Sequence, residues 1–237
     1  SQLTTHHSQL TTMKRILMYV LFGGLNYGIA FSQEATMQAV APTQNPEYVQ
    51  AMTDVVADIQ SAPFGQDLVP FANTLERIAA AEPKEWLPPY WGAFCYMLKS
   101  FSEPVAEKKD QLLERAEALV ATADALHPND DEVEVLKANI ASARMAVDPQ
   151  NRWQKYVPIS MAAIAKAKTI NPLNPRITLH EAQGVFYTPE AYGGGKAKAL
   201  PMIKTAIEQF KLFKPASPMM PNWGADAAEF MLVEAQK

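Results

Sequence analysis

Apolar side chains recur at helical spacing along most of the chain after residue 33. The first clear stretch places its apolar residues so that they share one helical face, at Tyr48, Met52, Val55, Val56 and Ile59. The same part of the sequence has no Asn-Gly or Asp-Gly hairpin turn and no sustained alternation of apolar and polar residues, which are the signals of strands. The pattern predicts an all-α fold.

Helix start and stop signals divide this pattern into separate segments. Asn45, followed by Pro46, supplies a capping side chain and a proline at the first helical position. The predicted helices span Pro46–Ser61, Asp67–Ala81, Pro89–Phe101, Val105–Leu126, Asp131–Val147, Arg152–Ile170, Pro175–Tyr187, Lys196–Phe213 and the chain from Asn222 onward.

Prolines at the ends of four of these helices show that the pattern repeats. They are Pro83, Pro128, Pro172 and Pro215, with separations of 45, 44 and 43 residues. The residue ten positions after each proline is an alanine: Ala93, Ala138, Ala182 and Ala225. A period of this length is typical of stacked helical hairpins, each of which covers the apolar face of the one before. We therefore expect an α-solenoid of about four helical hairpins, followed by a C-terminal capping helix.

Each repeat is about ten residues longer than the tetratricopeptide unit of about 34 residues. We expect the extra residues to lengthen the turn inside each hairpin. The candidate turns are Ser102–Lys108, Asp148–Arg152 and Thr188–Gly195.

The chain resembles tetratricopeptide-like proteins, and more narrowly a group of exported proteins typical of Bacteroidetes. The residues that carry the resemblance are Trp86–Trp91, Asp148-Pro149 with Arg152-Trp153, Phe186–Ala199 and Lys214–Pro218. The turn from Tyr192 to Ala199 is also similar to one in the helical accessory subunit of tripartite ATP-independent periplasmic transporters. The first resemblance implies a helical repeat protein without catalytic activity, and the second implies small-molecule binding.

The N-terminal segment looks like a targeting signal rather than part of the fold. Residues 1–12 contain the sequence Ser-Gln-Leu-Thr-Thr twice, so we interpret them as upstream of a natural start at Met13. Two basic residues follow, then an apolar stretch, and then the small-x-small sequence Ala30-Phe31-Ser32. We expect a signal peptide over residues 13–32 and export to the periplasm.

A retained membrane anchor is the alternative interpretation of the same apolar stretch, although the stretch is short and contains glycines. After the signal peptide we expect a flexible N-terminus over residues 33–44 and a helical repeat domain over residues 45–237. The full chain has a formal net charge of −4 and scattered basic residues, which argues against a nucleic-acid partner.

Motifs that would indicate a cofactor, a metal or catalysis are incomplete. The run from Gly193 to Lys196 lacks the first glycine, the hydroxyl residue and the preceding strand of a phosphate-binding loop. His180-Glu181 lacks the second histidine of a zinc-protease helix. The cluster of acidic residues within positions 129–134 fits the capped first turn of a helix. We expect a protein that is not an enzyme and has no cofactor or metal.

Binding residues are expected on the first helix of each hairpin, because these helices line the groove in tetratricopeptide stacks. The groove candidates are Tyr90, Asn139, Arg144, His180, Gln183 and Tyr187. Candidates at the turns are Arg152, Trp153, Tyr192, Gly193, Gly194, Gly195 and Lys196.

Arg152-Trp153 has two interpretations: an exposed anchor for a partner, or a tryptophan that fills a gap while Arg152 pairs with Asp148. The predicted function is a periplasmic scaffold that binds a protein or peptide. The alternative is a small-molecule binding accessory protein of an envelope transporter. The oligomeric state stays open.

Overall fold

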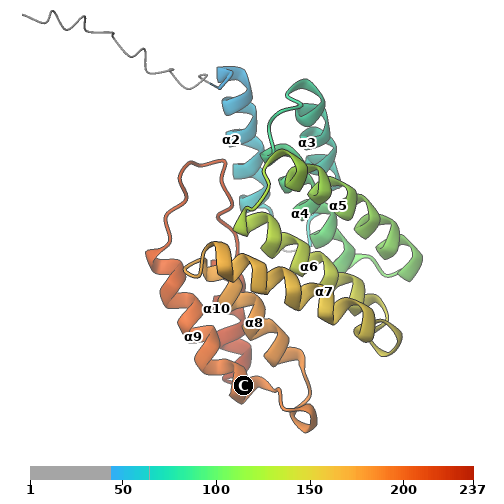
Figure 1. The fold of residues 1–237 in the computed structure, drawn as a ribbon, viewed down its shortest axis with the longest axis vertical. Helices are drawn as coiled ribbons and strands as arrows, with labels where there is room; N and C mark the ends of the chain where they lie inside the picture. Colours follow the sequence, from blue (N-terminus) through green and yellow to red (C-terminus); the bar gives the residue numbers. More distant parts are fainter. Residues whose placement is uncertain (1–43, 64) are drawn as a thin grey trace, which may run out of the picture. The chain divides into compact units, whose positions relative to one another are not determined.

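The computed structural model describes residues 44–63 and 65–237, which form helices without any strand (Figure 1). The predictions for residues 1–12 and 13–32, and that of a flexible N-terminus over residues 33–44 apart from Gln44, lie outside this part of the chain. The α-helices are α2 (Pro46–Ser61), α3 (Val69–Ala81), α4 (Leu87–Ser102), α5 (Ala106–Leu126), α6 (Asp131–Val147), α7 (Pro149–Ile170), α8 (Pro175–Tyr187), α9 (Lys196–Leu212) and α10 (Ala225–Ala235). A short 3₁₀ helix, η1, spans Glu190–Tyr192. The all-α prediction is confirmed.

Polar caps and prolines define where the helices begin and end. The side chain of Asn45 accepts a hydrogen bond from the backbone N–H of Glu47 at the start of α2. The side chain of Asp130 accepts a hydrogen bond from the backbone N–H of Val133 at the start of α6. This cap accounts for an acidic residue at the start of the helix. Each of the four repeat prolines stands two or three residues after a helix, because proline cannot continue one.

Neighbouring helices in the chain pack against each other within one unit over residues 44–237. The tightest pairs are α4 with α5, α6 with α7, and α8 with α9, and α10 packs on α9 (Figure 1). Helix α6 also contacts α4 and α8, so it links the three pairs.

The extra length of the repeats lies mainly in the helices rather than in the turns. A single residue, Asp148, separates α6 from α7, and only residues 103–105 separate α4 from α5. The expected extended turns at Ser102–Lys108 and Asp148–Arg152 are therefore wrong. Helices α5 and α7 instead reach 21 and 22 residues. The turn Thr188–Gly195 is long, as expected, and contains η1.

Small residues let the helices approach closely in the core. Ala93, Ala138 and Ala182 are completely buried, which agrees with their shared position in the repeat. Ala225 is not fully buried, because α10 starts at this residue. Ala228, three residues further along α10, is completely buried instead.

The segment between α9 and α10 crosses back to the N-terminal half of the unit. Trp91 of α4 donates a hydrogen bond from Nε1 to the carbonyl oxygen of Met219, at 2.8 Å. Trp223 donates from Nε1 to the hydroxyl oxygen of Tyr90, at 2.9 Å. This segment therefore fixes the last two helices to α4.

Within the described ranges, no helix combines the length and the apolar character that crossing a membrane requires.

Candidate functional site

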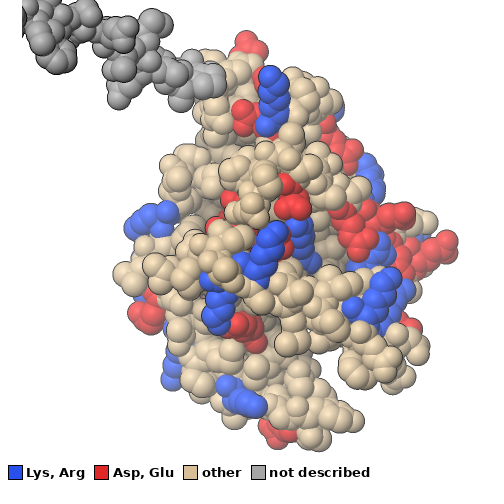
Figure 2. All heavy atoms as spheres, in the orientation of Figure 1, with Lys and Arg blue, Asp and Glu red and all other residues tan. Residues whose placement is uncertain are grey.

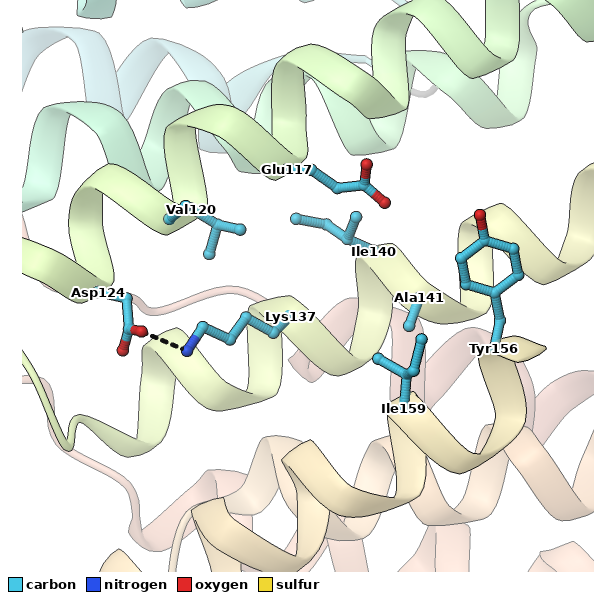
Figure 3. Close-up of a pocket in the computed structure, with 9 residues that line it drawn as sticks. Glu117, Val120, Asp124, Lys137, Ile140, Ala141, Tyr156 and Ile159 are labelled. Atoms are coloured by element: carbon cyan, nitrogen blue, oxygen red, sulfur yellow. Dashed lines mark ion pairs between the residues drawn. The ribbon is translucent and has the colours of Figure 1, made fainter.

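A groove of about 320 Å³ lies between α5 and α7, with α6 as its floor (Figure 3). Both outer helices pack on α6, and the space between them stays open. The lining residues are Glu117, Val120, Ala121 and Asp124 from α5, Lys137, Ile140 and Ala141 from α6, and Tyr156 and Ile159 from α7.

The centre of the groove is apolar. Val120 of α5 and Ile140 of α6 are almost fully buried, whereas Ile159 on the α7 wall is 48% exposed. Ala121 and Ala141 have short side chains, so they leave room between the helices. An apolar lining of this kind is typical of small-molecule sites.

Charged residues mark one end of the groove. Lys137 forms ion pairs with Asp124 at 2.7 Å and with Glu134 at 2.9 Å. Lys166 reaches the same Glu134 at 2.7 Å. The positive charges at this end are therefore already paired.

Tyr156 and Glu117 stand at the opposite end of the groove (Figure 3). The carboxylate of Glu117 accepts two hydrogen bonds from Arg144, at 3.0 and 2.7 Å. Arg144 also donates to Asp110 at 2.8 Å, so this predicted groove residue lies just behind the lining. The pKa of Arg144 is raised, first of all by its hydrogen bonds to Glu117.

Arg152 joins the same network through Asp110. It donates two hydrogen bonds to this carboxylate, at 2.6 and 2.7 Å, and these bonds lower the pKa of Asp110 to about 2. The expected pairing of Arg152 with Asp148 is wrong, because α7 starts three residues before Arg152 and turns this side chain towards α5. The neighbouring Trp153 is 53% exposed, which fits a surface anchor better than a buried plug.

Tyr90 does not line a groove, contrary to the prediction. Its side chain is completely buried in an aromatic cluster with Trp86, Trp91 and Trp223. Burial also raises the pKa of the Tyr90 hydroxyl well above its ordinary value. The reason is that Trp223, distant in sequence, covers the polar end of this tyrosine.

Asn139 and His180 come together, but beside the groove rather than in it. The ring nitrogens of His180 lie 2.9 Å from the hydroxyl of Ser160 and 3.3 Å from the side-chain oxygen of Asn139. Burial lowers the pKa of His180 to about 4. Both nitrogens are thus engaged in hydrogen bonds, and the ring is neutral at physiological pH.

The remaining candidates lie elsewhere on the surface. Gln183 is half-buried on α8, and Tyr187 at the end of this helix is 72% exposed. Tyr192, in η1, is also exposed. None of the three reaches the groove between α5 and α7.

The glycine turn before α9 has a structural explanation. Gly193 and Gly195 adopt positive φ angles of 80° and 103°. A Cβ atom on Gly194 would lie 2.3 Å from the carbonyl oxygen of Thr188, so only glycine fits there. Lys196 is the first residue of α9, and its amine lies 3.9 Å from a carboxylate oxygen of Glu234.

A smaller pocket of about 150 Å³ lies between the start of α6 and the segment after α9. Behind it, fully buried Arg176 donates a hydrogen bond to Glu132 at 2.9 Å and packs against Phe213 and Trp223. Burial raises the pKa of Glu132 to about 7. These contacts hold the C-terminal segment in place.

In the part of the chain that the structure covers, no group of three or more His, Cys, Asp and Glu residues is arranged to bind a metal.

None of the residues that line the groove is among the site residues predicted from the sequence. Tyr156 and Ile159 are spaced by three and so share a face of α7, which is a signal that could have identified this wall. The α5 wall carries charged and apolar residues together, and its pattern resembles an ordinary solvated helix. Lysine, arginine and acidic side chains are interspersed over the face in Figure 2, without a continuous basic stripe.

Comparison with known proteins gives one clear similarity. No protein-family model matches the chain, and no curated protein matches it. A solved structure, the HusA haemophore from Porphyromonas gingivalis, matches with a TM-score of 0.72 and 33% sequence identity. The match covers 82% of this chain and 95% of the HusA chain.

Proposed function

The chain belongs to the family of the HusA haemophore, and from this premise we propose that it is a non-catalytic binding protein for haem or a closely related tetrapyrrole. The observation that carries the proposal is the mainly apolar groove between α5 and α7. Of the two functions that the sequence suggested, this is the small-molecule one. The ligand differs from an enzyme's resident cofactor, because the protein would carry it as cargo.

The size of the groove supports partial burial of such a ligand. Its volume of about 320 Å³ is at the lower end of the range for small-molecule sites, which is about 300–1,000 Å³. A macrocycle would therefore enter by one edge and leave the opposite edge in solvent. Val120, Ile140 and Ile159 would cover the buried edge, since contact with apolar surface favours removal of the macrocycle from water.

The charges around the groove support the same orientation. Lys137 and Arg144 lie at its two ends, and both are already paired with carboxylates. The two carboxylates of haem would gain little from these paired groups. We propose that they stay at the exposed edge, in water.

A matched pair of substitutions on α7 tests this site. Ile159→Asp places a carboxylate on the groove wall and is expected to weaken haem binding by about tenfold or more, equivalent to at least about 1.4 kcal/mol. Met161→Asp is the control, because Met161 is 67% exposed on the same helix but does not line the groove. The measurement is a titration with ferric haem followed by absorption. Equal affinities for the two variants would contradict the proposed site.

A second proposal concerns a protein partner, supported by the half-exposed ring of Trp153 beside Arg152. Tryptophan and arginine are enriched at the centres of protein interfaces.

We also propose that the helix pairs form a tetratricopeptide-like stack of four hairpins capped by α10, and that the protein is exported to the periplasm. The regular proline spacing and the tight helix pairs support the stack, and the N-terminal sequence supports export.

A further inference from the structure

A cluster of four polar side chains lies where α6, α7 and α8 meet. Asn139 and Ser142 belong to α6, Ser160 to α7 and His180 to α8. The core that these three helices share is otherwise apolar, and alanine is its commonest residue. Buried polar groups need hydrogen-bond partners, so the members of this cluster depend on one another across the three helices.

Ser160 is the centre of the cluster. Its hydroxyl oxygen lies 2.9 Å from Nε2 of His180, and 3.1 Å from both the hydroxyl of Ser142 and the carbonyl oxygen of Ala138. Nδ1 of His180 lies 3.3 Å from Oδ1 of Asn139. This amide oxygen can only accept, so a neutral ring donates from Nδ1 and accepts at Nε2 from the hydroxyl of Ser160. A neutral His180 thus satisfies its neighbours on both helices.

The cluster ties the α7 wall of the groove to α6. Ile159, on the wall, is 48% exposed, whereas the next residue, Ser160, is buried on the other side of α7. On α6, Ala141 lines the groove, and the next residue, Ser142, contacts Ser160. The contacts of Ser160 with α6 and α8 therefore fix the position of the wall that Ile159 provides.

Burial, rather than a neighbouring charge, determines the protonation of His180. It lowers the pKa of the ring to about 4. The neighbours from α6 and α7, Asn139 and Ser160, are uncharged. Glu181, the next residue on α8, raises the pKa to a smaller extent. Its carboxylate also forms an ion pair with Lys168 of α7, at 3.1 Å, which offsets its charge.

A proton on Nε2 of His180 would change this arrangement. Nε2 would become a donor, so the hydroxyl of Ser160 could no longer donate to it. The ring would also carry a positive charge that is costly to bury without a paired anion. Movement of α7 away from the ring would admit water to this charge. Acid therefore favours a displaced α7 wall.

We propose that His180 positions the α7 wall through Ser160 and makes ligand release from the groove sensitive to acid, an inference that rests on the proposed function. The neutral ring holds the wall in place for the ligand. The protonated ring favours the displaced wall, and the tetrapyrrole then loses its contact with Ile159. Because one proton is involved, the change is limited to about tenfold per pH unit.

The release of protoporphyrin IX tests this inference. The complex is formed at pH 7.5 and mixed with detergent micelles, which trap the released ligand, at pH 6.5 or pH 4.5. Stopped-flow fluorescence measures the dissociation rate, and the two rates are compared within each protein. For wild type we expect the rate to rise by about tenfold or more at pH 4.5. Circular dichroism at pH 4.5 should show that the complex is still folded.

Two substitutions should remove most of this acceleration. His180→Gln deletes the titrating group, so its two rates should agree within about twofold. Asn139→Asp places a carboxylate beside Nδ1, which raises the pKa of the folded-state ring towards its ordinary value and offsets its buried charge. A ring with a purely structural role would not respond in this way. His127→Gln, at the end of α5, is the control and should keep the wild-type acceleration.

Wild-type acceleration in His180→Gln or in Asn139→Asp would overturn the inference, and Asn139→Asp decides alone if His180→Gln does not fold. Unfolding of the wild-type complex at pH 4.5 would overturn it too, because release would then need no movement of the wall. Equal wild-type rates at both pH values would refute the inference and leave the proposed function intact. Wild type that binds no tetrapyrrole at pH 7.5 would refute the proposed function itself.

Discussion

Single residues in this protein acquire their chemistry from partners that are far away in the sequence. His180 is the clearest case, since its ring contacts Ser160 on α7 and Asn139 on α6. As an isolated histidine in the sequence, it invited a binding role. In the folded chain it is a neutral, hydrogen-bonded ring between three helices, and its burial is what holds its pKa at about 4.

The shifted pKa of His180 predicts a specific dependence of stability on pH. The ordinary pKa is 6.5 and the folded-state pKa is about 4, so the unfolded chain binds the proton more tightly. The contribution of His180 to the free energy of unfolding is therefore complete above pH 6.5 and is lost as the pH falls to 4. The loss is of the order of 3 kcal/mol.

His180→Gln removes this titration and tests the expected loss. We expect wild type to be more stable than the variant at pH 7.5, and the difference in unfolding free energy to shrink steadily between pH 6.5 and pH 4. Urea unfolding at several pH values measures it. A difference that stays constant across this range would show that His180 does not carry the effect.

At the scale of single elements, local signals account for most of what is seen. Predicted boundaries of α2, α6 and α8 agree with the structure at both ends, because caps and prolines act within one helical turn. The turns inside the hairpins were harder to predict. After Val147 the chain bends at one residue, Asp148, and a proline starts the next helix immediately.

Replacement by alanine is expected to have opposite effects on stability at two glycines, one in α8 and one in the turn that follows it. Gly184 lies inside α8 with open space around a would-be Cβ atom, so Gly184→Ala should stabilise the protein by about 0.5–1 kcal/mol. Gly194→Ala should destabilise it by more than about 1 kcal/mol, because the new Cβ would meet the Thr188 and Val185 carbonyl oxygens. Thermal unfolding of both variants measures this. A neutral Gly194→Ala would mean that the turn is free to move.

For the whole molecule, the C-terminal segment and the groove are the important features. Trp223 packs against Phe94 of α4 and near Arg176 of α8, and so joins parts of the chain that are far apart in sequence. The groove likewise needs three helices, since both of its walls pack on α6. Neither feature can be identified from one helix alone.

Export and partner binding are tested together on the intact protein in its native cells. A photoreactive amino acid at position 153 should cross-link the mature protein, beginning at Gln33, to one discrete partner in the envelope fraction. The same group at Leu212, which is exposed on α9, is the control and should give no such product. Recovery of a chain that still carries residues 13–32 would contradict signal cleavage. Identical products from both positions would contradict a partner surface at Trp153.

The sequence by itself determined the all-α class, most helix boundaries and the burial of three of the four repeat alanines. These depend on interactions between residues a few positions apart, which a linear pattern records. The tertiary structure alone decided that Tyr90 is buried under Trp223, that Arg152 pairs with Asp110, and that the open space lies between α5 and α7. Periodicity shows which face of a helix is apolar. It does not show which other helix covers that face or leaves it open to a ligand.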